Sequence, residues 1–222
     1  IEIMEIVNDH NLFLIEDNAE CCLGKYNNEI TGSFGHVSSY SFENSKHISC
    51  GEGGMITTDD FELATAIRKI GNHGFKHLTA EEGRNKLNKN DYQNPNYKRH
   101  DEIGYNYRLS EFCSAIALAQ LEKIDKLMEL RKLSANKFLE VINNCDYLIP
   151  QYEPENIKHS YWALGIIYEG LKTIGVSWTD FRKKYINMGG DGIYGSWSVP
   201  YLEPVMLNRN YVKRNPDIYE NI

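Results

Sequence analysis

The sequence predicts an α/β protein whose sheet is mostly parallel. An amphipathic segment with apolar residues at Ile3, Ile6 and Val7 precedes the continuously apolar run 12–15, which ends in two acidic residues. A helix followed by a short buried strand is typical of parallel sheets, because both faces of such strands are covered. A long helical pattern follows over 110–143, and a helix of that length often bridges two domains. The 222 residues, 41% of them hydrophobic, can form the core of one large domain, or of one large and one small domain.

Between the first strand and the long helical pattern, turn and apolar residues alternate. The predicted hairpin tip is Asn27-Asn28, the next strands are 37–42 and 55–58, and a helix follows at 61–70. Asp59 or Asp60 can cap that helix, since its carboxylate accepts hydrogen bonds from the free N–H groups of the first turn. Residues 81–99 are almost wholly polar and predict a long loop. The pattern over 110–143 is either one helix or two with a bend.

The composition changes after Pro150, where a strand is predicted over 161–168 and Ser177 can cap a helix over 178–188. We therefore expect a second, smaller domain. The predicted division is 1–125 for the larger part and 126–222 for the linking helix with the C-terminal part.

Charge and cysteine usage narrow the functional class. A net charge of -7 argues against nucleic-acid binding, which usually requires a basic face. The five cysteines are odd in number and form no CxxC pair, which favours a reduced, cytoplasmic setting and argues against a metal site. The sequence holds no apolar run long enough to span a membrane. Because the first residue is Ile1 rather than Met, we expect the chain to be a fragment of a longer protein.

Three residues could carry chemistry together. Asp17 ends the first buried strand, Ser41 lies near the end of the next strand, and Lys46 follows in the adjoining loop. An acid can hold a protonated pyridine nitrogen, a hydroxyl can bind a phosphate, and an amine in a partly dry pocket can attack an aldehyde. Pyridoxal phosphate requires these three groups. From the spacing alone, a solvated lysine, a turn serine and an acid paired with a nearby base remain the more common reading.

Five ordered motifs change this balance. They are IEDNAE at 15–20, GSFG at 32–35, YSFENSKH at 40–47, GEGGM at 51–55 and GYNYRLSE at 104–111. Their order and spacing resemble the DegT/DnrJ/EryC1/StrS family, which comprises sugar aminotransferases of fold type I that depend on pyridoxal phosphate. The resemblance extends through AQLEKID at 119–125 and is vaguer in the C-terminal third. It implies the large-domain core of a fold type I enzyme, with part of a small α+β C-terminal domain.

The resemblance also implies a role for each matching residue. Lys46 matches the lysine that forms the Schiff base with the cofactor, Asp17 the acid that keeps its pyridine nitrogen protonated, and Ser41 a hydroxyl that binds its phosphate. Asn106 matches an asparagine that reaches the cofactor of the neighbouring subunit, which implies a homodimer with shared active sites. Glu20 departs from the family's usual Gln or His and is expected to contact the cofactor ring.

The function implied is transfer of an amino group from glutamate or glutamine to a nucleotide-linked keto-sugar, in amino-sugar or surface (lipopolysaccharide) polysaccharide biosynthesis. Family dehydratases carry His at the position of Lys46, so the lysine favours an aminotransferase. Two alternatives stay open: a dehydratase, and a non-catalytic or incomplete fragment that lacks the family's N-terminal cofactor contacts. A nicotinamide-dependent enzyme is disfavoured, because no Gly-rich turn follows the first strand.

Overall fold

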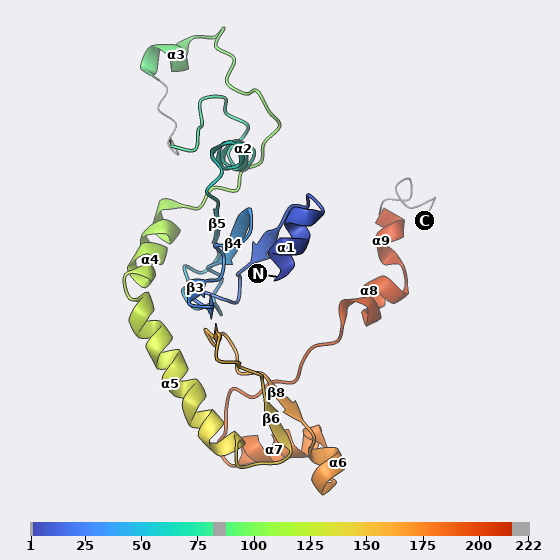
Figure 1. Ribbon diagram of the computed structural model, residues 1–222. Helices are drawn as coiled ribbons and strands as arrows, with labels where there is room; N and C mark the ends of the chain where they lie inside the picture. Colours follow the sequence, from blue (N-terminus) through green and yellow to red (C-terminus); the bar gives the residue numbers. More distant parts are fainter. Residues whose placement is uncertain (1, 82–87, 215–222) are drawn as a thin grey trace. The chain divides into compact units, whose positions relative to one another are not determined.

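The computed structural model describes residues 2–81 and 88–214, in which helices and short β strands follow one another in runs (Figure 1). The chain divides into two compact units, Ile1–Ile167 and Tyr168–Ile222. The predicted division into a large-domain part at 1–125 and a linking helix with a small C-terminal domain part at 126–222 stays a prediction.

A three-stranded sheet forms the centre of the first unit. Its strand order is β1 (Ile15–Asp17), β4 (Val37–Ser41) and β5 (Gly54–Thr57). β1 runs parallel to β4, as predicted, whereas β4 and β5 are antiparallel. Asp17 is in register with Ser39 of β4. The carboxyl ends of β1 and β4 therefore lie side by side, which is where parallel sheets gather functional groups.

A small sheet also belongs to the first unit. It contains β3 (Glu29–Ile30), β2 (Lys25–Tyr26) and β7 (Ile157–Lys158), in that order. Asn27 and Asn28 form the predicted hairpin tip, with φ angles of 50° and 68°. Two consecutive left-handed residues are the requirement of the tightest hairpin turns, and asparagine tolerates this conformation better than most residues do.

The first unit contains five helices within the described residues. They are α1 (Glu2–Asp9), α2 (Phe61–Gly71), α3 (Lys89–Gln93), α4 (Glu111–Leu121) and α5 (Ile124–Ile142). Three of them, α2, α3 and α4, begin at a residue whose side chain caps the first turn. Asp60 Oδ1 accepts hydrogen bonds from two N–H groups of the first turn of α2, as predicted, and Ser110 Oγ caps α4.

The long helical pattern is two helices, which follow one another with a break at residues 122–123 (Figure 1). Within the predicted polar loop 81–99, α3 is a short helix, and residues 82–87 lie outside the described part.

The buried core joins the end of β4 to α4. Phe42, Ile48, Cys50 and Ala117 are buried together. Leu109, Cys113, Ile124 and Leu127 pack against this cluster. The backbone of Phe42 donates to the carbonyl of Gly53 and accepts from the N–H of Cys50, so the loop after β4 is closed at its base. The core therefore fixes the segment that carries Lys46.

The remaining elements are short. They are β6 (Leu148–Pro150), β8 (Ile166–Tyr168), α6 (Gly170–Ile174), α7 (Trp178–Asn187), η1 (Pro200–Leu202), α8 (Pro204–Leu207) and α9 (Asn210–Arg214). Ser177 caps α7, as predicted. The strand expected over 161–168 is restricted to β8: Tyr161 adopts a left-handed φ of 50°, which excludes it from an extended strand, and residues 162–165 are bends or irregular backbone. In the described ranges, no helix combines the length and the apolar character that crossing a membrane requires.

Candidate functional site

The ends of β1 and β4 place Asp17 and Ser41 on one face of the sheet. Ser39 Oγ donates a hydrogen bond of 3.4 Å to Asp17 Oδ1, so the two side chains lie on the same face. Ser41 follows Ser39 by two residues in the same strand, and alternate residues of a strand share a face. Asp17 Oδ1 also accepts from the N–H of Ala19 at 3.0 Å. The acid and the hydroxyl of the predicted site thus share one surface.

Residues 43–50, here called the lysine loop, begin with a network of local hydrogen bonds. Ser41 Oγ accepts from the N–H of Glu43 at 3.2 Å. The Glu43 carboxylate accepts from the N–H and the hydroxyl of Ser45 at 2.9 and 2.6 Å, and these bonds hold the pKa of Glu43 below its ordinary value. The N–H of Lys46 donates to the carbonyl of Glu43 at 3.1 Å. These bonds set the direction in which the Lys46 side chain leaves the loop.

The Lys46 amine is held by two groups. Its Nζ lies 2.9 Å from Glu20 Oε1 and 4.6 Å from the centre of the Trp162 ring. The Lys46 side chain is only 14% exposed, whereas that of Glu20 is 54% exposed. Glu20 follows the carboxyl end of β1, so its contact brings the lysine loop to the edge where Asp17 lies. A cation–π contact of this kind strengthens as water is removed from it.

His47, next to the lysine, is buried, and its ring forms a hydrogen bond with the backbone. Its Nε2 lies 3.0 Å from the carbonyl oxygen of Ser160. A carbonyl only accepts, so Nε2 carries the hydrogen. Burial lowers the pKa of His47, the charges of Arg131 and Lys46 lower it further, and the bond to Ser160 only partly opposes them. His47 is therefore a neutral donor at neutral pH.

The structure places Asn106 on a different part of the first unit. It lies in residues 103–110, here called the asparagine loop, and is exposed. Its Oδ1 accepts a hydrogen bond of 2.9 Å from Arg108 Nε, and its backbone bridges to Asn72 at the end of α2. The structure thus brings together Lys46 with Glu20 and Asp17 with Ser41, and Asn106 contacts other residues.

Sequence reasoning did not find Arg131 and Trp162, although both contact the lysine loop. Trp162 Nε1 donates to the carbonyl of Ser45 at 3.0 Å, and Arg131 Nη2 donates to the carbonyl of Lys46 at 3.3 Å. Arg131 lies among many charged residues of a helix, and Trp162 lies in a stretch expected to be a strand. Local sequence carries no signal for contacts that span 85 and 117 residues.

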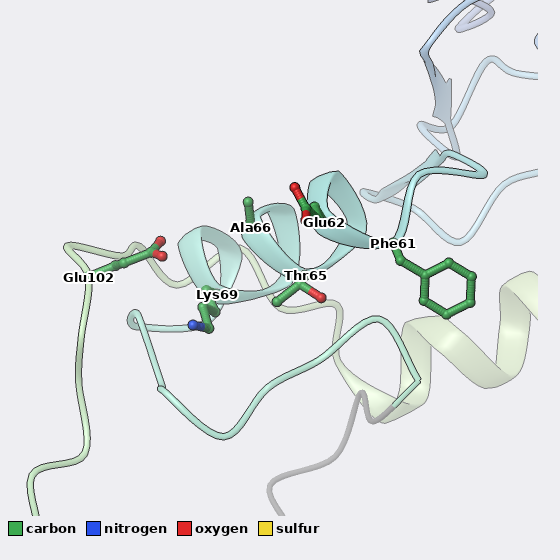
Figure 2. Close-up of a pocket in the computed structure, with 6 residues that line it drawn as sticks. All are labelled: Phe61, Glu62, Thr65, Ala66, Lys69 and Glu102. Carbon is green, nitrogen blue, oxygen red and sulfur yellow. The ribbon is translucent and has the colours of Figure 1, made fainter.

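A shallow pocket of about 330 Å³ lies elsewhere, along α2 (Figure 2). It is lined by Phe61, Glu62, Thr65, Ala66, Lys69 and Glu102. Its lining includes none of the five predicted site residues, and Lys69 forms an ion pair of 3.0 Å with Asp101 beside it. In the ranges that the structure describes, no group of three or more His, Cys, Asp or Glu residues is arranged to hold a metal ion.

The groups at the strand ends match the needs of pyridoxal phosphate. Asp17 offers a carboxylate, Ser41 a hydroxyl on the same face, and Lys46 a shielded amine in the loop that follows. An acid, a hydroxyl and an amine suit a pyridine nitrogen, a phosphate and an aldehyde respectively.

The fold defines the class of protein. The structure is similar to an aminotransferase from Psychrobacter cryohalolentis, with a TM-score of 0.80 and 26% identity over 94% of this chain and 53% of that one. It is also similar to the E. coli GDP-4-keto-6-deoxy-D-mannose-3-dehydratase with bound hydrated PLP, with a TM-score of 0.71 and 26% identity over 99% of this chain and 52% of that one. The chain is therefore an α/β protein of fold type I, the fold of pyridoxal-phosphate aminotransferases, as predicted.

Sequence comparison then gives the family. The DegT/DnrJ/EryC1/StrS aminotransferase family matches residues 1–177, and the chain belongs to it. GDP-perosamine synthase of Escherichia coli O157:H7 is 33% identical over 166 residues, which are 75% of this chain and 40% of that protein. The chain thus spans about half or less of the length of the relatives that it matches. The predicted family is confirmed, and the similar dehydratase holds PLP, the cofactor that the sequence leads us to expect.

Proposed function

We propose that the protein is an aminotransferase that moves an amino group from glutamate or glutamine to a nucleotide-linked keto-sugar. The observation that carries the proposal is the environment of Lys46. Its amine is largely shielded and rests between Glu20 and Trp162, at the sheet edge where Asp17 ends β1. A solvated surface lysine would not be held in this way. We place the reaction in the cytoplasm, within amino-sugar or surface-polysaccharide biosynthesis, and the five free cysteines support that compartment.

Each residue of the site then has a chemical task. When bound, pyridoxal phosphate supplies an aldehyde carbon that bonds to amines and a ring that withdraws electrons. Asp17 would hold the proton of the ring nitrogen, and Ser41 would bind the phosphate. Lys46 would bond to the cofactor and, once released, carry a proton as general base and then general acid. Glu20 would receive the released ammonium, as it does at 2.9 Å in the structure.

A second copy of the chain would complete the site. Asn106 contacts Arg108 and the end of α2 within its own chain, and its loop carries exposed apolar and aromatic side chains. Ile103 is 88% exposed and Tyr107 is 73% exposed. Large apolar side chains that cluster on a surface are typical of protein interfaces. We propose that this loop faces the partner subunit in a homodimer and that Asn106 reaches the partner's cofactor.

The test of the function is Lys46→Ala in the complete protein. After addition of pyridoxal phosphate and reduction with borohydride, peptide mass spectrometry should find the cofactor on Lys46 of the wild type and nowhere in the variant. Transamination of a nucleotide keto-sugar with labelled glutamate or glutamine should be lost in the variant. Transamination retained by Lys46→Ala would refute the assignment. A wild type that takes up no cofactor would favour the reading of a non-catalytic fragment.

The second candidate function is dehydration of the same class of sugar, because one structural neighbour is a dehydratase. Lys46 stands at the position where family dehydratases carry a histidine, and the adjacent His47 is buried and bound to the Ser160 carbonyl. A histidine that donates its Nε2 hydrogen to a backbone carbonyl is not placed to abstract a proton from a sugar through that atom. Product mass decides the matter: an aminated sugar supports the proposal, and a deoxygenated sugar supports the dehydratase.

A further inference from the structure

Three consecutive residues of the lysine loop are each held by a different group from outside it. The carbonyl of Ser45 accepts from Trp162 Nε1 at 3.0 Å, and the carbonyl of Lys46 accepts from Arg131 Nη2 at 3.3 Å. The ring of His47 binds the carbonyl of Ser160 at 3.0 Å. Loop backbones are ordinarily solvated, so a separate anchor for each of three successive residues is unusual.

Arg131 links the lysine loop to the segment that carries Tyr161 and Trp162. Its Nη1 donates to the carbonyls of Tyr161 and Trp162 at 3.3 and 3.4 Å, while its Nη2 donates to Lys46 on the lysine loop. Each of these bonds is long. The rigid guanidinium nevertheless joins both segments through one group with several donors, which a lysine with its single point charge would do less well. Arg131 lies in α5, a helix of 19 residues, so it offers a rigid support.

Trp162 acts on both the backbone and the amine. Its indole N–H fixes the Ser45 carbonyl, and its ring lies 4.6 Å from the Lys46 amine. The segment that carries it is firmly held, since Ser160 is 6% exposed and Tyr161 is 8% exposed. The Tyr161 hydroxyl donates to Glu153, which together with burial raises the pKa of Tyr161 to about 12. Trp162 thus presents one face of its ring to the amine from a fixed position.

We infer that Arg131 and Trp162 are positioning residues for Lys46. They form a brace that holds the backbone of the lysine loop and sets the direction of the amine. Arg131 does so through the Lys46 carbonyl, and Trp162 through the Ser45 carbonyl and the face of its ring. The inference rests on the proposed function of Lys46 and assigns to it two residues that the five motifs do not contain.

The test measures loading of Lys46 in the complete protein, not only turnover. Each variant is titrated with pyridoxal phosphate, reduced with borohydride and digested, and the fraction of Lys46 peptide that carries the cofactor is determined by mass spectrometry. Arg131→Met should require about tenfold more cofactor for half loading, because a charged donor to the loop backbone is lost. Arg131→Lys should recover only part of this loss.

Two substitutions of Trp162 separate its two contacts. Trp162→Phe keeps a ring beside the amine but removes the indole donor to Ser45, and should weaken loading about threefold. Trp162→Leu removes both and should weaken it further. In both variants kcat should fall more than the KM for the amino donor rises, because the position of the amine rather than substrate binding has changed. A role in folding alone would lower thermal stability and leave loading per folded molecule unchanged.

The matched control is Arg68→Met. Arg68 Nη1 also donates to backbone carbonyls, those of Thr79 and Ala80, but on α2 and away from the lysine loop. Arg68→Met should load Lys46 with cofactor as well as the wild type does. If the wild type loads Lys46 and all Arg131 and Trp162 variants load it equally well, the brace is overturned and the proposed function stands. A wild type that never loads Lys46 overturns the proposed function, and the brace with it. If Arg131→Met fails to fold, Trp162→Phe decides.

Discussion

The lysine loop and the asparagine loop differ in what holds them. In the lysine loop, Ile48 and Cys50 are buried, and residues 45–47 are bound by side chains and carbonyls from other parts of this chain. In the asparagine loop, the N–H groups of Tyr105 and Tyr107 donate to carbonyls at the end of α2 and Leu109 packs against the core, but Ile103, Tyr105 and Tyr107 are exposed.

Two aromatic side chains of the asparagine loop, Tyr105 and Tyr107, are stacked with ring centres 5.1 Å apart, and both are more than half exposed. A fixed backbone with exposed aromatic side chains is suited to contact another surface, whereas the lysine loop is complete within one chain. This difference is what we expect if one chain builds the amine side of the site and a second chain, as proposed above, contributes Asn106.

Mixing two inactive variants tests this division most sharply. Lys46→Ala and Asn106→Ala should each lose activity by orders of magnitude as homodimers. If the two proteins are denatured and refolded together, half of the dimers are hybrids, and each hybrid has one site with both residues intact. About a quarter of the wild-type activity should therefore return. Mixing Lys46→Ala with Asp17→Ala is the control, since both residues belong to one chain's side of the site and the hybrid has no intact site. Equal recovery in both mixtures would contradict the division.

Core and surface phenylalanines provide the next test. Phe42 is 8% exposed at the base of the lysine loop, and Phe112, just after the asparagine loop, is 84% exposed. Phe42→Ala should lower the free energy of unfolding by about 3 kcal/mol, because it leaves a cavity in the core. Phe112→Ala should change it by no more than about 0.5 kcal/mol in the monomer. Urea denaturation measures both.

The concentration dependence of these transitions sharpens the comparison. Dimerisation stabilises a protein by mass action, so the unfolding midpoint of the wild type should rise with protein concentration. Phe112→Ala should reduce that rise, and Phe42→Ala should leave its slope unchanged. If Phe112→Ala destabilises the dilute protein as much as Phe42→Ala does, the surface near Asn106 is part of this chain's own core and the comparison fails.

Much of the fold could be predicted because it depends on local signals. The caps at Asp60 and Ser177 and the hairpin tip at Asn27-Asn28 are set by the backbone needs of a few adjacent residues. The strand expected over 161–168 was too long: the left-handed φ of Tyr161 excludes it from an extended strand, and this segment is bound by Arg131, which is distant in sequence.

The residues of the site also divide into those with a local sequence signal and those without one. The motifs pointed to Lys46, Asp17 and Ser41, and the strand register shows why Asp17 and Ser41 can act together. Arg131 and Trp162 could not be found, since neither stands in a recognisable motif and both act across more than 80 residues. Glu20 was expected at the cofactor ring, and the structure adds a contact to the Lys46 amine that spacing could not reveal.

The smallest effect we expect concerns pH and the lysine loop alone. Burial lowers the pKa of His47 in the folded state, whereas in the unfolded chain it titrates near its ordinary value of about 6.5. Below that pH the unfolded chain binds a proton that the folded chain does not, so His47 costs stability as the pH falls from about 7 to 5. His47→Gln keeps a donor for the Ser160 carbonyl but cannot titrate. Its stability should match the wild type at pH 8 and fall less steeply below pH 6.5, as followed by urea denaturation at each pH.

The asparagine loop holds no histidine, so Asn106→Ala should retain the wild-type pH profile of stability. Parallel profiles for His47→Gln and the wild type would mean that His47 is protonated in the folded loop.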